Sequence, residues 1–242
     1  MSTVSVSEVR PSLLSGPAFF LLRRLHSLTG LLFGGYLCVH LLINATLIEG
    51  VRHDGQPTVF QMQVDKIHSL PFLEVIEWTA IFAPFLFHAL YGILVTANGA
   101  SNVGKYTYTK NWFYTLQRIS AIVILLFVAF HALTLKGVIG PKELHFVPTQ
   151  YATESTIGHL QYAAWIPVIY LIGVVASTFH LANGFWTAAI SWGLTVSKQA
   201  QQRFGYVCAV VFLATTACGL TALVAGVTGK SKPIPANVVV EH

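Results

Sequence analysis

The chain has 242 residues, of which 54% are apolar and only 10% are charged, with a net charge of +5 and a mean hydropathy of +0.64. About a quarter of the residues of a typical soluble domain are charged. The composition therefore excludes an ordinary soluble domain and predicts an integral membrane protein.

Five apolar stretches are each long enough, at roughly 20 or more residues, to cross the hydrocarbon core of a bilayer. Polar loops that carry glycine and proline separate them. The stretches cover residues 25–48, 72–97, 113–135, 163–190 and 204–227. We therefore predict an all-α integral membrane fold of five transmembrane helices, forming a single membrane domain over residues 1–242.

The distribution of charge predicts the orientation of these helices. The N-terminal segment does not resemble a cleavable signal peptide, because Arg23 and Arg24 follow its short apolar run and no small-residue cleavage site comes after them. A cytoplasmic N-terminus places eight of the fourteen basic residues on the inner side, but only Glu8 of the nine acidic ones. The positive-inside rule thus favours a cytoplasmic N-terminus and an outer C-terminus.

Each of the first four stretches carries one histidine about two-thirds of the way along, namely His40, His88, His131 and His180. An imidazole at membrane depth is costly to bury and needs a partner. One histidine on each of four helices indicates a shared ligand that takes nitrogen donors inside the membrane, and haem is the leading candidate. Because the sequence has no C-x-x-C-H motif for covalent attachment, we expect non-covalent, b-type haem.

The depths of the four histidines sort them into two pairs. At 1.5 Å per residue, His40 and His131 lie ~22 Å and ~27 Å from the inner edge of a ~30 Å hydrocarbon core, near the outer face. His88 and His180 are on helices that run inward and lie ~24–26 Å from the outer edge, near the inner face. We therefore predict two stacked bis-histidine haems inside a bundle of the first four helices.

Small residues near these histidines indicate room for a porphyrin. Gly34 precedes His40 on its helix, and Gly92 and Gly184 follow their histidines by four residues, on the same helical face. A larger side chain one turn from an iron ligand would strike the macrocycle. The alternative is close helix packing, for which Gly34 is suitably spaced from Gly30.

Polar residues at the inner ends of the first and third helices are candidates to hold the propionates of the inner haem. They are Arg24, His26, Ser27 and Arg118. For the arginines, anchoring of a helix end in the headgroup region is an equal alternative. The other histidines receive no ligand role, because they are expected in outer loops or the tail, where an exposed imidazole needs no partner; they are His53, His68, His145, His159 and His242.

Several short segments resemble one known family. They are Arg23-Arg24-Leu25-His26-Ser27, Leu70-Pro71-Phe72, His88-Ala89-Leu90-Tyr91-Gly92, Asn111-Trp112, Leu116-Gln117-Arg118, His180-Leu181-Ala182-Asn183-Gly184 and Trp192-Gly193-Leu194-Thr195-Val196. Together they are similar to the cytochrome b558 subunit of bacterial succinate dehydrogenases, the five-helix, two-haem branch of the succinate:quinone and quinol:fumarate oxidoreductases. The similarity extends over nearly the whole chain, from residue 19 to about residue 227.

The resemblance implies that the four histidines are the axial ligands, with the pairing that their depths predict. It also implies a flavoprotein subunit and an iron–sulfur subunit on the cytoplasmic face of a bacterial inner membrane, so that this chain has haem and quinone sites but no succinate site. Fumarate-reducing members carry a glutamate, part of a proton path, where this chain has Thr178. This departure favours succinate oxidation, and the resemblance favours menaquinone as the acceptor.

We expect the quinone site near the outer haem, where Glu74, Glu77 and Trp78 begin the second helix. Quinone reduction consumes protons, so a carboxylate near the outer surface is a suitable relay, and Glu77 lies one turn deeper than Glu74. The carboxylates could instead only stabilise a helix N-terminus. The rival location is the inner end, with Arg24 and Ser27 as quinone ligands.

Two other functions stay open at this point. One is the cytochrome b subunit of another respiratory enzyme, such as a hydrogenase, a formate dehydrogenase or a nitrate reductase. The other is a histidine-lined transporter, which should carry carboxylates in mid-membrane, whereas the spans carry only Glu74 and Glu77, both at an outer end. Lipid and quinone are the expected partners, and no nucleic acid is expected.

Overall fold

The computed structural model describes residues 16–50, 56–99, 103–105 and 108–235. In this part of the chain all regular structure is helical. The elements are α1 (Pro17–Ala45), η1 (Thr46–Glu49), α2 (Val59–His68), α3 (Leu73–Ile76), η2 (Glu77–Phe82), α4 (Ala83–Ala97), α5 (Thr109–Leu135), η3 (Lys142–Leu144), α6 (Pro148–Gln161), α7 (Trp165–Ser191) and α8 (Lys198–Thr228). Residues 149–151 of α6 lie outside helical geometry.

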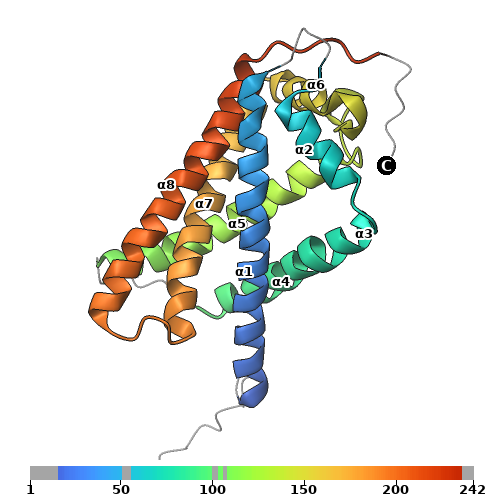
Figure 1. Cartoon of the computed structure of the whole chain (residues 1–242). Helices are drawn as coiled ribbons and strands as arrows, with labels where there is room; N and C mark the ends of the chain where they lie inside the picture. The colour runs from blue at the N-terminus through green and yellow to red at the C-terminus, as the bar shows by residue number, and fades with distance from the viewer. Residues whose placement is uncertain (1–15, 51–55, 100–102, 106–107, 236–242) are drawn as a thin grey trace, which may run out of the picture.

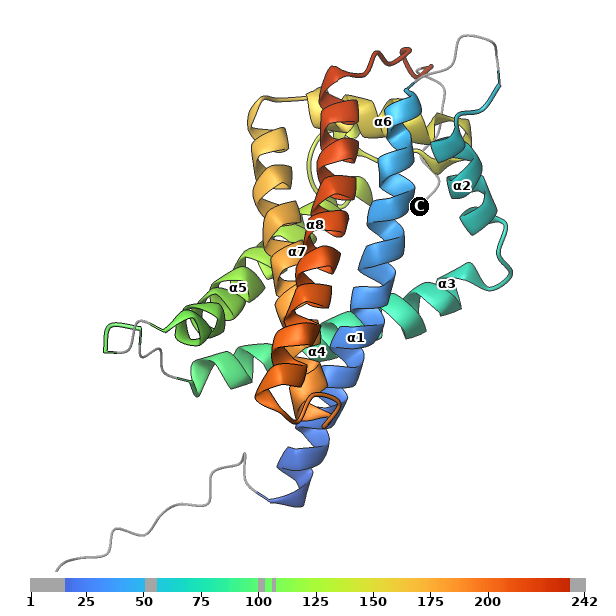
Figure 2. The same cartoon turned by 60° about the vertical axis from the view of Figure 1, so that its left-hand side comes forward.

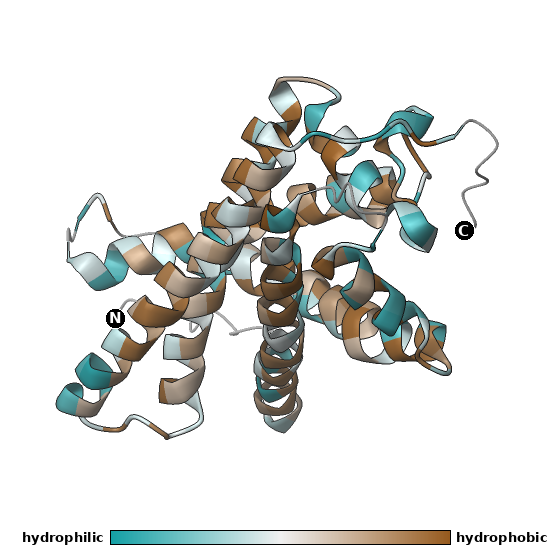
Figure 3. Ribbon diagram, turned by 45° about the horizontal axis from the view of Figure 1, so that its top comes forward, coloured by the Kyte–Doolittle hydropathy of each residue, from teal (hydrophilic) through white to brown (hydrophobic). Residues whose placement is uncertain are grey.

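Five helical segments of the described chain are long and apolar enough to cross a membrane, which confirms the predicted fold class. They are Pro17–Glu49, Leu73–Ala97, Thr109–Leu135, Trp165–Ser191 and Lys198–Thr228. Figure 3 shows apolar residues along these helices and hydrophilic residues concentrated on the connections and helix ends. Many large apolar side chains, such as Leu126 and Leu213, point outward. An apolar exterior on this scale suits lipid rather than water.

The long helices form two groups. Helices α1, α7 and α8 lie side by side, while α4 and α5 are strongly inclined to them (Figures 1 and 2). We call the end at which α2 and α6 lie the cap end, and the end at which α1 begins and α7 ends the base end. The helices that carry the four histidines, α1, α4, α5 and α7, therefore enclose a common space without being parallel.

The second span is not one regular helix. Its residues Glu77–Phe82 form a π-helical stretch, and Pro84 follows near the start of α4. Proline has no amide hydrogen, and its ring collides with the carbonyl four residues earlier, which here belongs to residue 80. Residue 80 lies within the wider π-helical stretch, and such stretches are common where a helix bends. Pro84 is thus accompanied by a π-helical stretch that begins at Glu77.

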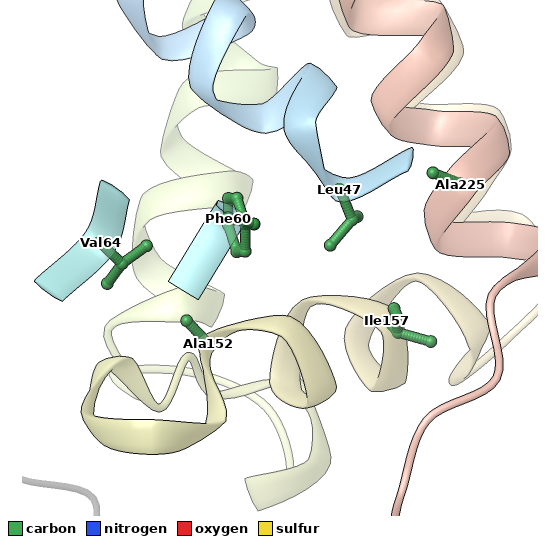
Figure 4. Packing of buried hydrophobic residues seen from close by; sticks show 6 residues of the cluster. All are labelled: Leu47, Phe60, Val64, Ala152, Ile157 and Ala225. Carbon is green, nitrogen blue, oxygen red and sulfur yellow. The ribbon is translucent and has the colours of Figure 1, made fainter. Parts of the chain in front are cut away.

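Two short helices close the cap end, where the sequence indicated only polar loops. Helix α2 packs on α6 through buried apolar side chains, and the same cluster reaches η1 and α8 (Figure 4). Its members are Leu47, Phe60, Val64, Ala152, Ile157 and Ala225. The Gln61 amide joins the two helices, because it donates to the Pro148 carbonyl at 2.7 Å and accepts from the Ala152 N–H at 2.7 Å.

Candidate haem cavity and its histidine pairs

One cavity of about 1590 Å³ extends through the molecule from the base end to the cap end. Pockets for single drug-sized ligands occupy about 300–1,000 Å³. The walls come mainly from α1, α4, α5 and α7, and all four span histidines line them. The cavity is thus large enough for more than one such ligand and presents imidazoles at two levels.

The structure brings the four imidazoles together in the pairs that their depths predicted. The His40 and His131 ring centres lie 5.8 Å apart toward the cap end, and those of His88 and His180 lie 6.2 Å apart toward the base end. An imidazole nitrogen binds a first-row metal at about 2 Å, and the ring centre is about 1 Å behind it, so two imidazoles on opposite sides of one metal have centres about 6 Å apart. Both spacings suit a single iron between each pair.

The base-end pair is held in the tautomer that iron requires. His88 Nδ1 lies 2.9 Å from the His26 carbonyl oxygen, and His180 Nδ1 lies 3.1 Å from the Gln117 carbonyl oxygen and 3.1 Å from Ser120 Oγ. Because a carbonyl only accepts, Nδ1 of each ring carries the proton and donates it. This leaves the Nε2 lone pair of both rings for a metal, in the arrangement that metal-binding histidines usually adopt.

The cap-end pair also directs Nδ1 away from the space between the rings. His131 Nδ1 lies 2.9 Å from the Tyr170 hydroxyl, whereas His40 Nδ1 lies 3.4 Å from the hydroxyl of Tyr36, one turn earlier on the same helix. The second contact is long for a hydrogen bond. Among the described residues, no group of three or more His, Cys, Asp and Glu side chains could bind a metal. Two imidazoles are the protein ligands that suit an iron whose other ligands come from a porphyrin.

Polar atoms at the base end lack a partner within the described chain. Arg24 stacks on Trp192, with its guanidinium carbon 4.8 Å from the ring centre, and His26 stacks on His88 with ring centres 4.1 Å apart. The buried atoms without a hydrogen-bond partner among the described residues include Arg24 Nη1, His26 Nδ1, Tyr91 OH and Arg118 Nη1. All four residues line the cavity. Buried donors need acceptors, and the carboxylates of haem propionates would supply them.

Ser27 has a different environment from the other base-end candidates. Its hydroxyl accepts a hydrogen bond of 2.9 Å from Trp192 Nε1, which ties the start of α1 to the end of α7. Its side chain still lines the cavity. A structural role in joining two helices is therefore established by geometry for Ser27, and a role in ligand binding stays a prediction.

The glycines around the histidines serve two purposes. Gly34, Gly92 and Gly184 line the cavity, as a role in leaving room for a porphyrin requires. A Cβ on Gly34 would lie 2.5 Å from Leu181 Cδ1, so this glycine also permits close packing of α1 on α7. The nearest described atom to a Cβ on Gly184 would be Gln117 Nε2 at 3.7 Å, which leaves space at that position. Both explanations of these glycines thus apply, each at particular positions.

Gly30 lies against the ring of a span histidine, which yields a prediction. A Cβ there would lie 2.5 Å from Cε1 of the His88 ring, which its hydrogen bond to His26 holds in place. We expect Gly30→Ala to displace His88 and to lower the content of the base-end haem, while the cap-end haem stays. The matched control is Gly35→Ala, because a Cβ on Gly35 meets no described atom within 4 Å. Haem quantitation of the two purified variants measures the effect, and equal haem contents would contradict it.

The two carboxylates at the start of the second span lie in different environments. Glu77 lines the cavity near the cap end and lies 3.8 Å from Lys136 Nζ in an ion pair. Glu74 and Trp78 are not part of the lining, and Trp78 is 54% exposed on the outer surface of the helix. Of the three expected quinone residues, Glu77 is therefore the one placed to meet a ligand inside the protein.

Comparison with known proteins identifies the family of this chain. No protein-family model matches it. The chain is 32% identical over 216 residues to the succinate dehydrogenase cytochrome b558 subunit of Bacillus subtilis (strain 168), and the match covers 88% of this chain and 99% of that protein. The chain belongs to the succinate dehydrogenase cytochrome b558 subunit family. The resemblance carried by the short segments is thereby confirmed.

In this cytochrome b558 family member, Thr178 is buried in the contact between helices α7 and α8. Its side chain is 0% exposed, and its hydroxyl bonds the Val174 carbonyl at 2.9 Å and Thr216 Oγ1 of α8 at 2.8 Å. Both hydrogen-bonding capacities of the hydroxyl are used within the protein. Thr178 therefore joins α7 to α8, and the position does not supply an ionisable group.

Two residues that line the cytochrome b558 cavity were not predicted from the sequence. Tyr91, three residues after His88, reads as an ordinary core aromatic, yet its hydroxyl is one of the buried atoms without a partner among the described residues. His159 was expected to be exposed in an outer loop, and this expectation is wrong: the side chain is 1% exposed, in α6. It lines the cavity behind Tyr170. Its spacing of eleven residues from Tyr170 across a helix break offers no periodic signal.

Proposed function

We propose that this chain is the membrane anchor of a bacterial succinate dehydrogenase and holds two bis-histidine b haems. The observation that carries the proposal is the arrangement of the imidazoles. They form two facing pairs in one cavity, with ring centres 5.8 Å and 6.2 Å apart. Membership of the cytochrome b558 family supports the choice of b-type haem and of succinate dehydrogenase as the complex.

The two ends of the molecule would face different compartments. Basic residues gather at the base end, where α1, α5 and α8 begin; they are Arg23, Arg24, Lys110, Arg118, Lys198 and Arg203. This distribution supports a cytoplasmic base end and an outer cap end in a bacterial inner membrane. When bound, the two haems would supply a one-electron conduit from a cytoplasmic iron–sulfur subunit, through the inner His88/His180 site and the outer His40/His131 site, to a membrane quinone.

The remaining residues of the cavity have distinct roles in this proposal. The four histidines would hold iron through Nε2, and the Nδ1 hydrogen bonds of His88, His180 and His131 orient those three rings. At the base end, the buried polar atoms of Arg24, His26, Tyr91 and Arg118 would bind the propionates. A carboxylate beside a guanidinium is stabilised in its charged form.

We place the quinone site at the cap end, beside Glu77. The Glu77 carboxylate faces the cavity and takes protons from the outer side, with Lys136 as its ion-pair partner at 3.8 Å. Moving an electron toward the positive outside is favourable by about 2.3 kcal/mol per 100 mV. A membrane potential then assists reduction of a low-potential quinone, and menaquinone is our choice. The closed helix contact of Thr178 supports succinate oxidation over fumarate reduction.

Affinity purification of the chain from its own host tests the proposed function. We expect the solubilised, tagged chain to bring down a flavoprotein and an iron–sulfur subunit, and with them succinate oxidation by an artificial acceptor. The control is the same tag on an unrelated inner-membrane protein. Recovery with the subunits of a hydrogenase, a formate dehydrogenase or a nitrate reductase would replace succinate dehydrogenase by that enzyme. Recovery without any redox partner would contradict the anchor role.

A further inference from the structure

A line of three hydrogen bonds runs from the cap-end ligand His131 into the cap. His131 Nδ1 lies 2.9 Å from the Tyr170 hydroxyl, and the same hydroxyl lies 2.9 Å from His159 Nε2. His159 Nδ1 lies 2.9 Å from the Leu144 carbonyl oxygen. The line thus runs from α5 through α7 and α6 to η3. It ties the ligand His131 to α6 and η3 at the cap end.

The far end of the line fixes the direction of every bond in it. The Leu144 carbonyl can only accept, so His159 Nδ1 donates. Burial lowers the pKa of His159, against the smaller raising effect of the Leu144 carbonyl, so this ring is neutral and its Nε2 is an acceptor. The Tyr170 hydroxyl therefore donates to His159 Nε2, and its oxygen is left to accept from His131 Nδ1.

No comparable line holds the facing ligand. His40 Nδ1 has the 3.4 Å contact with Tyr36, which lies on the same helix and, among the described residues, makes no hydrogen bond to the cap. The base-end ligands bond directly to backbone carbonyls of neighbouring helices. Within the part of the chain that the structure describes, His131 is thus the span histidine whose orientation depends on two further side chains.

We propose that Tyr170 and His159 are positioning residues that hold His131 in its Nδ1–H tautomer and lower the reduction potential of the outer haem. This inference rests on the proposed function. A ligand imidazole that donates from Nδ1 to a good acceptor becomes more basic at Nε2, and a more basic ligand favours the oxidised iron. The Tyr170 oxygen is a better acceptor because its own hydrogen is donated onward to His159.

The alternative is that the two side chains serve only to fill space. Tyr170 does pack against Phe127, with ring centres 5.3 Å apart, and against the His159 ring at 5.4 Å. Tyr170→Phe keeps these ring contacts and removes only the hydroxyl. His159→Leu removes both hydrogen-bonding nitrogens, whereas His159→Gln offers an amide that donates to the Leu144 carbonyl and accepts from Tyr170. The three variants therefore separate hydrogen bonding from packing.

Redox titration of the two haems in the assembled complex tests the proposal. The component that a His131 variant lacks identifies the outer haem. We expect Tyr170→Phe to raise the outer midpoint potential and to leave the inner one unchanged. We expect His159→Leu to raise it by less, and His159→Gln to return it to the wild-type value. The electron paramagnetic resonance signal of the oxidised outer haem should shift in the first two variants alone.

The possible results are distinct. An unchanged outer midpoint in Tyr170→Phe, with both haems bound, overturns the proposal, and so do equal midpoints in His159→Leu and His159→Gln. The His159 pair decides the matter if Tyr170→Phe does not assemble. A wild-type complex that lacks a haem bound by His131 would instead refute the proposed function on which the inference depends.

Discussion

We expect alanine in place of His88 or His180 to remove the inner haem alone, and alanine in place of His40 or His131 to remove the outer haem alone. Each pair of rings faces across the cavity at a spacing that suits one iron, so loss of either ring leaves that iron with a single protein ligand. The two pairs use different hydrogen-bond partners, so we expect loss of one ring to leave the other pair in place. We expect each variant to lose about half of the b-type absorbance.

The control for these variants is His68→Ala, because His68 is exposed at the end of α2 and is not part of the cavity lining. It should retain both haems. The decisive comparison is between His40→Ala and His88→Ala in reduced-minus-oxidised spectra and redox titrations. Loss of the same redox component from these two variants would contradict the pairing, because they belong to different pairs.

We expect glutamine in place of Glu77 to slow succinate:quinone turnover by about 100-fold or more, the usual cost of losing a general acid or base. The carboxylate faces the cavity at the cap end and lies 3.8 Å from Lys136 Nζ, so it can exchange protons between the outer side and a bound quinone. Glutamine has nearly the same shape but cannot carry the proton. Haem spectra and succinate oxidation by an artificial acceptor should stay at wild-type values.

Glu74→Gln provides the matched control for this result. Glu74 precedes Glu77 by about one turn, is exposed and does not line the cavity, so its amide variant should keep quinone turnover. If Glu77→Gln also turns over quinone at the wild-type rate, the quinone site lies elsewhere. The base end, where Arg24 and Ser27 line the cavity, is then the location to examine by the same approach.

The span helices and the histidine pairs were accessible from sequence for a simple reason. A membrane helix is long, apolar and regular, so position along it converts directly to depth. Depth alone sorted His40 with His131 and His88 with His180. The inclination of α4 and α5 does not disturb this result, because the helices still approach one another at the two histidine levels.

The cap was not accessible in the same way. Helices α2 and α6 are short and polar in composition, and their stability depends on partners far away in the chain, such as the contact of Gln61 with Pro148 and Ala152. Tertiary packing, not local preference, makes such helices form. The burial of His159 follows from this packing. A single sequence gives no signal for a histidine that is buried by an element whose existence it does not predict.

The haem content of the purified chain tests the central claim most directly. The reduced-minus-oxidised spectrum and the pyridine haemochrome of the detergent-solubilised protein, measured against protein concentration, give the number and type of haems per chain. Our account predicts two b-type haems per chain, one for each pair of facing imidazoles. A single haem per chain, or none, in this measurement would contradict it.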